Sequence, residues 1–198
     1  MQVLSLVVLI SGSGSNLRAL LDACQNPMYP VRVLAVGSDK PAEGLEHAEL
    51  FGIPTFVVEP SQFASRAEWA QALREQIEFM NPDVILLAGF MKVLPENFVS
   101  TFYPRIVNMH PSLLPAFPGA HAVRDALAAG ASTTGATLHV VDSGVDTGPV
   151  IAQREIPIRP GVSEAELQDE IKAVEREQLV SIIQRIADSE IKLEEIAR

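Results

Sequence analysis

The beginning of the chain alternates an apolar run with an amphipathic stripe. Residues 3–10 are almost continuously apolar, as expected for a strand that is buried on both faces of a parallel sheet. A stripe with the helical spacing i, i+3, i+4, i+7 follows, formed by Leu17, Leu20, Leu21 and Cys24. Because a Ser/Gly segment at residues 11–16 separates the two, the sequence predicts a strand, a tight loop and a helix in succession.

The same alternation continues along most of the chain. Further strands are predicted over residues 31–37, 55–58, 84–88 and 105–109, with a short helix over 43–51 that ends at Gly52. A longer helix begins at a capping box of Ser65 and Glu68 and ends before Asn81-Pro82. Repeated strand and helix units with short links predict a single-domain, Rossmann-like α/β fold with a doubly wound, mostly parallel sheet.

The last third of the chain predicts a different arrangement. Residues 134–141 and 150–156 resemble two strands joined by an acidic loop at 142–148, which we expect to extend the sheet in an antiparallel fashion. Ser163 and Glu166 form a second capping box, which begins a long final helix. The apolar side of that helix is expected to contain Leu167, Ile171, Val174, Ile182 and Ile186.

Size and charge restrict the class of protein. The 198 residues, of which 47% are hydrophobic, suffice for one core, so we expect one domain over residues 1–198. The net charge of -10 disfavours non-specific binding to nucleic acid or to an anionic membrane. No apolar run approaches the roughly 18 residues of a spanning helix, and the apolar start lacks the basic region of a signal peptide. We therefore expect a cytoplasmic protein without nucleic-acid or membrane partners, in which the single cysteine, Cys24, is a buried structural thiol.

The strongest candidate for chemistry is the segment Asn108-Met109-His110-Pro111-Ser112-Leu113-Leu114-Pro115 together with Asp146. Asn108 and His110 are two residues apart on a predicted strand and therefore share a face. An amide donor, an imidazole and a carboxylate are the groups that a proton-transferring acyl-type site needs. Two alternatives stay open: His110 as a histidine that caps the strand end, and Asp146 as a turn residue. Spacing alone does not bring Asp146 to His110.

The loop at residues 11–16 predicts an anion site. Glycines at a strand-to-helix turn let backbone N–H groups approach a phosphate, although they could also serve only to make the turn. The dinucleotide fingerprint would need a third glycine where this chain has Leu17, although Asp39 stands about where a ribose-binding acid would. A single phosphate therefore fits better than a pyrophosphate.

The segment Ala88-Gly89-Phe90-Met91-Lys92 follows a predicted strand on the same edge of the sheet as His110. Phe90 and Met91 either line an apolar slot for a flat ring or simply close the core. The chain's histidines show no metal-ligand pairing and there is no second cysteine, so no metal is expected. His139 is either a satisfied core histidine or a group that supports the site.

These motifs, in this order, resemble the folate-dependent phosphoribosylglycinamide formyltransferases of purine synthesis. The similarity extends from Val3 to the final helix and includes residues 11–16, 88–91, 108–115 and 146–149. It implies a formyltransferase fold with a phosphate-binding N-terminal half (about 1–100) and a catalytic, folate-binding C-terminal half (about 101–198). The implied reaction transfers a formyl group from 10-formyltetrahydrofolate to the amine of glycinamide ribonucleotide, and a homodimer stays open.

The resemblance also implies roles for individual residues. The ribonucleotide would be held by Gly12, Ser13, Gly14, Ser15, Asn16 and Glu175, and the folate by Arg66, Met91, Lys92, Val93, Leu94, Asn108 and Asp142. Asn108 and protonated His110 would stabilise the oxyanion that forms on the formyl oxygen. Asp146 would raise the pKa of His110 and so help the imidazole to act as an acid near neutral pH.

Three alternatives accompany this interpretation. Methionyl-tRNA formyltransferase and formyltetrahydrofolate hydrolase share the formyl-transfer motif, but each carries an additional domain for which this chain offers no segment. A non-catalytic nucleotide-binding module is suggested by the loop at Gly12 and Gly14 and by Asp39. Length and acidity favour the small-molecule transferase.

Overall fold

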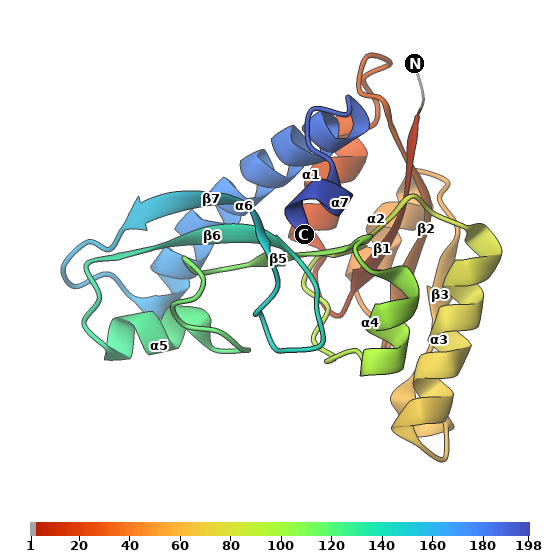
Figure 1. Cartoon of the computed structure of the whole chain (residues 1–198). Helices are drawn as coiled ribbons and strands as arrows, with labels where there is room; N and C mark the ends of the chain where they lie inside the picture. The colour runs from red at the N-terminus through yellow and green to blue at the C-terminus, as the bar shows by residue number, and fades with distance from the viewer. Residues whose placement is uncertain (1–2) are drawn as a thin grey trace.

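The computed structural model describes residues 3–198, and over that range the chain forms one seven-stranded sheet flanked by helices (Figure 1). The strand order is β3-β2-β1-β4-β5-β6-β7. The strands are β1 (Leu4–Ile10), β2 (Val31–Ser38), β3 (Thr55–Val57), β4 (Val84–Leu87), β5 (Ile106–His110), β6 (Thr133–Val140) and β7 (Val150–Pro157). The first five strands pair in parallel, whereas β6 and β7 are antiparallel to their neighbours. The predicted doubly wound sheet with an antiparallel extension is confirmed.

Helices cover both faces of the sheet. They are α1 (Ser15–Ala23), α2 (Gly44–Leu50), α3 (Arg66–Met80), α4 (Glu96–Phe102), α5 (Ala122–Ala128), α6 (Glu164–Ala187) and α7 (Leu193–Ile196), with a 3-10 turn at Pro60–Gln62. One core cluster packs α1, α2, α6 and α7 against one face of β1 and its neighbours. A second cluster packs α3 and α4 against the other face. In Figure 1 these two helices lie apart from α1 and α6.

The alternation of side chains along β1 explains this two-sided core. Leu6, Val8 and Ile10 belong to the cluster beneath α1 and α6, whereas Val7 and Leu9 belong to the cluster beneath α3 and α4. All five side chains are fully buried. Because successive strand residues point to opposite faces, a continuous apolar run is needed to fill both layers.

Of the two predicted capping boxes, the one at Ser163 forms completely, whereas at Ser65 the Glu68 carboxylate accepts from the Ala64 N–H at 3.3 Å instead of the Ser65 N–H. The Ser65 hydroxyl accepts a hydrogen bond from the Glu68 N–H at 3.2 Å. Ser163 and Glu166 form a complete capping box at the start of α6. The αL residue Asn81 (φ 47°) ends α3 before Pro82, as predicted from Asn81-Pro82.

Some elements differ from the sequence prediction. The short helices α4, α5 and α7 were not predicted, because four to seven residues carry little periodicity. The equally short α2 was predicted with the help of Gly52, which ends it. The strand predicted over 105–109 is shifted by one residue, so that His110 itself ends β5. Cys24 is only partly buried at the edge of the first core cluster, and burial raises its thiol pKa to about 11.

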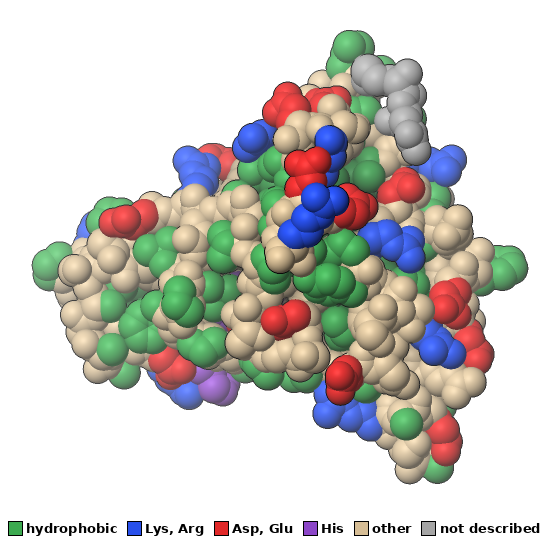
Figure 2. Space-filling view, in the orientation of Figure 1, with side chains coloured by type: hydrophobic (Ala, Val, Ile, Leu, Met, Phe, Trp, Pro, Cys, Tyr) green, Lys and Arg blue, Asp and Glu red, His purple; other side chains and the backbone are tan. Residues whose placement is uncertain are grey.

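Acidic and basic side chains lie intermingled over the face shown in Figure 2. No helix within residues 3–198 is both long enough and apolar enough to cross a bilayer.

Candidate active site

The candidate site lies at the carboxyl ends of the parallel strands. The strand order reverses between β1 and β4, and the loops that follow these two strands are the predicted anion loop and the segment around Met91. Open α/β sheets bind ligands at such a switch point. β5 lies next to β4 and carries Asn108 and His110 to the same edge.

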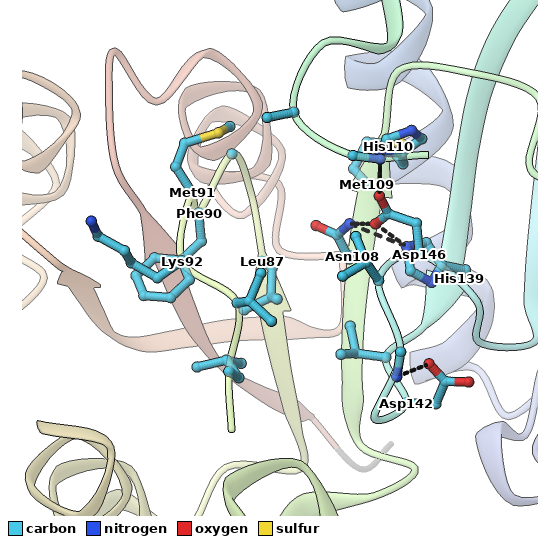
Figure 3. A pocket seen from close by; sticks show the side chains of 18 of the residues that line it. Leu87, Phe90, Met91, Lys92, Asn108, Met109, His110, His139, Asp142 and Asp146 are labelled. Carbon is cyan, nitrogen blue, oxygen red and sulfur yellow. Dashed lines mark hydrogen bonds and ion pairs between the residues drawn. The ribbon is translucent and has the colours of Figure 1, made fainter. Parts of the chain in front are cut away.

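Asp146 lies at the centre of a polar cluster (Figure 3). Its Oδ2 atom is 3.4 Å from His110 Nδ1, and its Oδ1 atom is 3.5 Å from both His139 Nε2 and Asn108 Nδ2. The Asn108 amide nitrogen is also 3.1 Å from His139 Nε2. The fold therefore brings the predicted trio together and adds His139 to it, a residue whose place the sequence left open.

The pairing of β5 with β6 explains how His139 reaches this cluster. Asn108 is directly opposite His139 in the antiparallel ladder, and both strand residues face the same pocket. His139 Nδ1 is 2.9 Å from the Val140 carbonyl oxygen, so Nδ1 carries the proton of that hydrogen bond and Nε2 accepts from Asn108.

The loop between β6 and β7 returns Asp146 to the site. Asp142 accepts hydrogen bonds from the Gly144 N–H at 3.0 Å and from the Thr147 hydroxyl at 2.7 Å, which closes the loop on itself. Asp146 itself has a left-handed backbone (φ 55°), a conformation that Asp and Asn tolerate better than most residues. The Gly119 N–H donates to Asp146 Oδ2 at 2.7 Å and fixes the orientation of the carboxylate.

His110 has acceptors on both sides of its ring. Its Nε2 atom is 2.9 Å from the Phe117 carbonyl oxygen, and its Nδ1 atom faces Asp146. Burial lowers the pKa of His110; the Phe117 carbonyl and the Asp146 carboxylate raise it, and His139 lowers it further. The net pKa is lowered, so the predicted rise is wrong. Asp146 acts in the expected direction, but burial of the imidazole outweighs it.

The carboxylate of Asp146 remains ionised. Burial raises its pKa, but the contact with His139, the hydrogen bond from the Gly119 N–H and the nearby His110 lower it more, so the net shift is downward. A fixed negative charge beside a neutral, buried imidazole favours any process in which that imidazole gains a proton.

The proline-rich loop after β5 is held in place by two polar side chains of the antiparallel strands. The Thr137 hydroxyl donates to the Ser112 carbonyl at 2.6 Å and accepts from the Leu114 N–H at 3.2 Å. Gln153 Nε2 donates to the Leu114 carbonyl at 2.7 Å and to the Thr137 oxygen at 3.0 Å. The loop then presents the Phe117 carbonyl to His110 and the Gly119 N–H to Asp146.

A pocket of about 190 Å³ opens beside the cluster. Its facing wall contains Leu87, Phe90, Met91 and Lys92, as Figure 3 shows. Val93, Leu94 and Asp142 also line it. Met91, Val93 and Val145 are large apolar side chains that are exposed at this pocket. A polar cluster on one side and an apolar wall on the other suit a flat, partly apolar ligand.

A second pocket of about 220 Å³ lies over the anion loop. It is lined by Gly12, Ser13, Gly14, Ser15 and Asn16, and from α6 by Gln168, Ile171, Lys172 and Glu175. Gly14 has φ 70°, and a Cβ there would lie 2.9 Å from Gly44 Cα, so this position requires glycine. Within the described chain no side chain caps the start of α1, which leaves its first N–H groups directed at the pocket.

Glu175 reaches this second pocket from the opposite side. It is 6% exposed and accepts a hydrogen bond from Asn16 Nδ2 at 3.1 Å. Burial raises its pKa, although Asn16, Lys172 and Arg176 act in the other direction. Among residues 3–198, Asn16 Oδ1 has no hydrogen-bond partner, so a donor from a ligand would be accommodated there.

The two pockets share a boundary. Gly89, Met91, Met109 and Pro111 line both of them. Met109 and Pro111 flank His110 in the sequence, so ligands in the two pockets would approach each other beside the imidazole. This adjacency provides the geometry for group transfer between two bound molecules.

Arg66 lies outside both pockets. Its guanidinium donates to the Val93 carbonyl, and it lines an adjoining groove with Trp69, Met91 and Lys92. Asp39 is 4% exposed, accepts a hydrogen bond from the Ser11 hydroxyl and pairs with Lys92. Its carboxylate is therefore directed at protein groups and not at an open site for a ribose.

Sequence reasoning missed several contributors. Thr137 and Gln153 carry no motif, although Thr137 shares a strand face with His139 and this two-residue spacing was a usable signal. Lys172 is one turn from Glu175 on α6 and was also missed. Over residues 3–198 no group of three or more His, Cys, Asp or Glu side chains is placed to hold a metal ion.

Comparison with known proteins extends this description. The chain matches the formyl transferase family model over residues 4–183. It is 47% identical to phosphoribosylglycinamide formyltransferase from Mycobacterium tuberculosis, covering 92% of this chain and 84% of that protein. It is 41% identical to the Escherichia coli protein of the same name, covering 98% and 92%.

A solved structure gives the same result for the fold. The glycinamide ribonucleotide transformylase 1 of Symbiobacterium toebii superposes with a TM-score of 0.91 at 39% identity, covering 94% of this chain and 89% of that one. The family match over residues 4–183 includes all seven strands rather than a single motif.

Proposed function

The chain belongs to the phosphoribosylglycinamide formyltransferases, and on this premise we propose that it transfers a formyl group from 10-formyltetrahydrofolate to the amine of glycinamide ribonucleotide, a step of purine biosynthesis. The observation that carries the proposal is the shared boundary of the two pockets beside His110. One pocket suits a flat ring and the other a phosphate and an amine, so the two substrates would meet where the polar cluster lies.

In the proposed reaction the substrate amine attacks the formyl carbon. A C–N bond forms to the glycinamide nitrogen, the C–N bond to the folate nitrogen breaks, and one proton passes from the attacking to the departing nitrogen. Negative charge grows on the formyl oxygen during the attack. In this proposal the Asn108 amide nitrogen, which contacts His139 and Asp146 in the free structure, turns to donate a hydrogen bond to this oxygen. Donors of this kind stabilise the developing oxyanion in the transition state.

His110 and Asp146 serve the proton transfer. The lowered pKa keeps the imidazole of His110 mainly neutral near pH 7, and its Nε2–H donates a hydrogen bond to the Phe117 carbonyl. As the oxyanion forms, His110 gains a proton more readily, because both Asp146 and the growing charge favour the imidazolium. The imidazole then acts as the relay by which the proton reaches the leaving nitrogen, directly or through a water held by Asp146.

Substrate binding is assigned to groups on either side. The N–H groups of the loop 12–16 would hold the phosphate, and Glu175 would orient the amine. Met91, Lys92, Val93 and Leu94, with Asp142 opposite, would hold the folate, and Arg66 would bind its tail from the adjoining groove. Each pocket takes residues from both the N-terminal half (about 1–100) and the C-terminal half (about 101–198), so the domain works as one unit. A cytoplasmic location follows from the proposed substrates.

The experiment that tests this proposal measures turnover and binding separately. Purified protein is given 10-formyltetrahydrofolate and glycinamide ribonucleotide, and formation of the formylated amide is followed. His110→Ala is the variant, and calorimetric binding of the ribonucleotide is its control. We expect wild-type turnover, and in the variant intact binding with a kcat lower by about 10²–10³-fold.

The outcomes separate the alternatives. A wild-type protein that releases formate without a formylated amide would favour a hydrolase, and one that formylates only aminoacyl-tRNA would favour the tRNA enzyme. A protein stabilised by dinucleotides but not by folates or the ribonucleotide would favour a nucleotide-binding module. Full turnover by a well-folded His110→Ala variant would reject the role given to the imidazole.

A further inference from the structure

Asp39 is a buried carboxylate that the proposed reaction does not use. It follows the last residue of β2, at the same edge of the sheet as the two pockets, and it is 4% exposed. An ionised carboxylate at such a position is costly unless strong partners compensate it. Its partners therefore indicate what the residue does.

The first partner connects Asp39 to the segment that lines the folate-side pocket. The Ser11 hydroxyl donates to Asp39 Oδ1 at 2.5 Å, and the oxygen of the same hydroxyl accepts from the Met91 N–H at 2.8 Å. Because a serine hydroxyl has only one proton, donation to Asp39 turns its lone pairs toward Met91. Ser11 is joined to this segment a second time, since its own N–H donates to the Gly89 carbonyl at 3.1 Å.

The second partner is the next residue of that segment. Lys92 Nζ lies 3.8 Å from Asp39 Oδ2, and its side chain is 46% exposed. One buried carboxylate thus holds two consecutive residues of the pocket wall, Met91 through its backbone and Lys92 through its ammonium group. Met91 is 66% exposed and Lys92 borders solvent, so neither is fixed by burial.

We propose that Asp39 is a positioning residue for the folate-binding segment, residues 91–94. Its carboxylate fixes the position of this segment through its contacts with Ser11 and Lys92. This inference rests on the proposed function, because it takes residues 91–94 as the wall that contacts the formyl-folate. Lys92, Val93 and Leu94 line the folate-side pocket but not the phosphate-side pocket. Met91 lines both pockets, so loss of Asp39 is expected to affect the folate more strongly than the ribonucleotide.

The test compares Asp39→Asn with wild type. Asparagine keeps the shape and one acceptor for Ser11 but removes the charge that strengthens this bond and pairs with Lys92. We expect KM for 10-formyltetrahydrofolate and the Kd for tetrahydrofolate to rise about tenfold. We expect kcat and KM for glycinamide ribonucleotide to change less than about twofold.

The chain offers a matched control at the opposite edge of the same strands. Asp83, just before β4, accepts from the Ser5 hydroxyl at 2.6 Å and from the Ser5 N–H at 2.8 Å, and Ser5 lies in β1. Asp83→Asn likewise removes the charge of a serine-bound carboxylate, here an exposed one that joins β1 to the start of β4 and lines neither pocket. We expect it to lower Tm while leaving both KM values unchanged.

The other outcomes also decide the proposal. A folded Asp39→Asn variant with unchanged KM and Kd for the folates, or one that loses only Tm and kcat as a structural residue would, overturns it. If that variant does not fold, Ser11→Ala serves instead, because it keeps Asp39 paired with Lys92 and should show the same selective rise. A wild type that binds tetrahydrofolate without transferring formyl groups refutes the proposed function, while the Kd comparison still decides the role of Asp39. A wild type that binds no folate overturns both.

Discussion

We expect Asp146→Asn to slow the chemical step without weakening substrate binding. Asparagine tolerates the left-handed backbone at this position (φ 55°), and its carbonyl oxygen can still accept from the Gly119 N–H. The substitution therefore keeps the local structure and removes only the negative charge. Alanine would remove the hydrogen bond and strain the backbone as well, and would confuse the two effects.

The magnitude follows from the distance between the two groups. His110 Nδ1 and Asp146 Oδ2 are 3.4 Å apart, with side chains only 5% and 13% exposed. A charge pair at this distance attracts with about 5 kcal/mol at an effective dielectric constant of about 20. Because the lowered pKa keeps His110 neutral before reaction, this attraction acts only when the imidazole gains its proton. The amide dipole of asparagine replaces part of this attraction. We therefore expect the transition state to lose about 3–4 kcal/mol of stabilisation, which lowers kcat by about 10²–10³-fold.

Two measurements check this reasoning. Steady-state kinetics should show the fall in kcat with both KM values within about threefold of wild type. NMR titration of the His110 ring should show a lower pKa in the variant, since Asp146 is one of the groups that raise it. A folded Asp146→Asn enzyme with kcat within tenfold of wild type, or with a raised His110 pKa, would refute the argument.

Three further predictions concern buried polar groups. Because the pKa of Glu175 is raised in the folded protein, this residue contributes stability below pH 4.5, the ordinary pKa of a glutamate. That stability is lost as pH rises through the folded pKa. Glu175→Gln should therefore raise Tm at pH 8 but not at pH 4, while KM for glycinamide ribonucleotide rises about tenfold or more; equal Tm gains at both pH values would contradict it. Thr137→Val should cost about 2 kcal/mol of unfolding free energy in urea, and lower kcat because the loop facing His110 loses its anchor; an unchanged kcat would deny that link. The lowered His110 pKa means that the unfolded chain binds this proton first, so stability is present above pH 6.5 and falls as pH drops below it. His110→Gln should flatten that fall in denaturation curves taken from pH 7.5 to 5, and a slope identical to wild type would argue against a buried neutral imidazole.

The parallel part of the fold could be predicted because its elements are long and differ in period. The apolar run of β1 and the helical stripe of α1 each fill a whole element, so their types follow from the spacing alone. The seven residues of α4 complete barely two turns, so the helical spacing of its buried side chains Phe98, Val99 and Phe102 is repeated too few times to identify a helix. Local pattern was therefore insufficient where tertiary packing decides the structure.

The candidate site, like the fold, was predictable only where local sequence pattern determines the geometry. Asn108 and His110 share one strand, so their convergence follows from strand geometry. The approach of Asp146 depends on how a loop folds back, and the partners of Asp39 come from the ends of two other strands, β1 and β4. The sign of the His110 shift was wrong because burial is a property of the whole fold, whereas only the neighbouring charge could be inferred from the motif.

The most direct test of the account follows the formyl carbon itself. Protein, glycinamide ribonucleotide and 10-formyltetrahydrofolate labelled with ¹³C in its formyl group are mixed in a single turnover and observed by NMR. We expect the label to move to the glycinamide nitrogen in wild type, and to move about 10²–10³-fold more slowly in His110→Ala. Label that appears as free formate in wild type, or that moves equally fast in the variant, would contradict it.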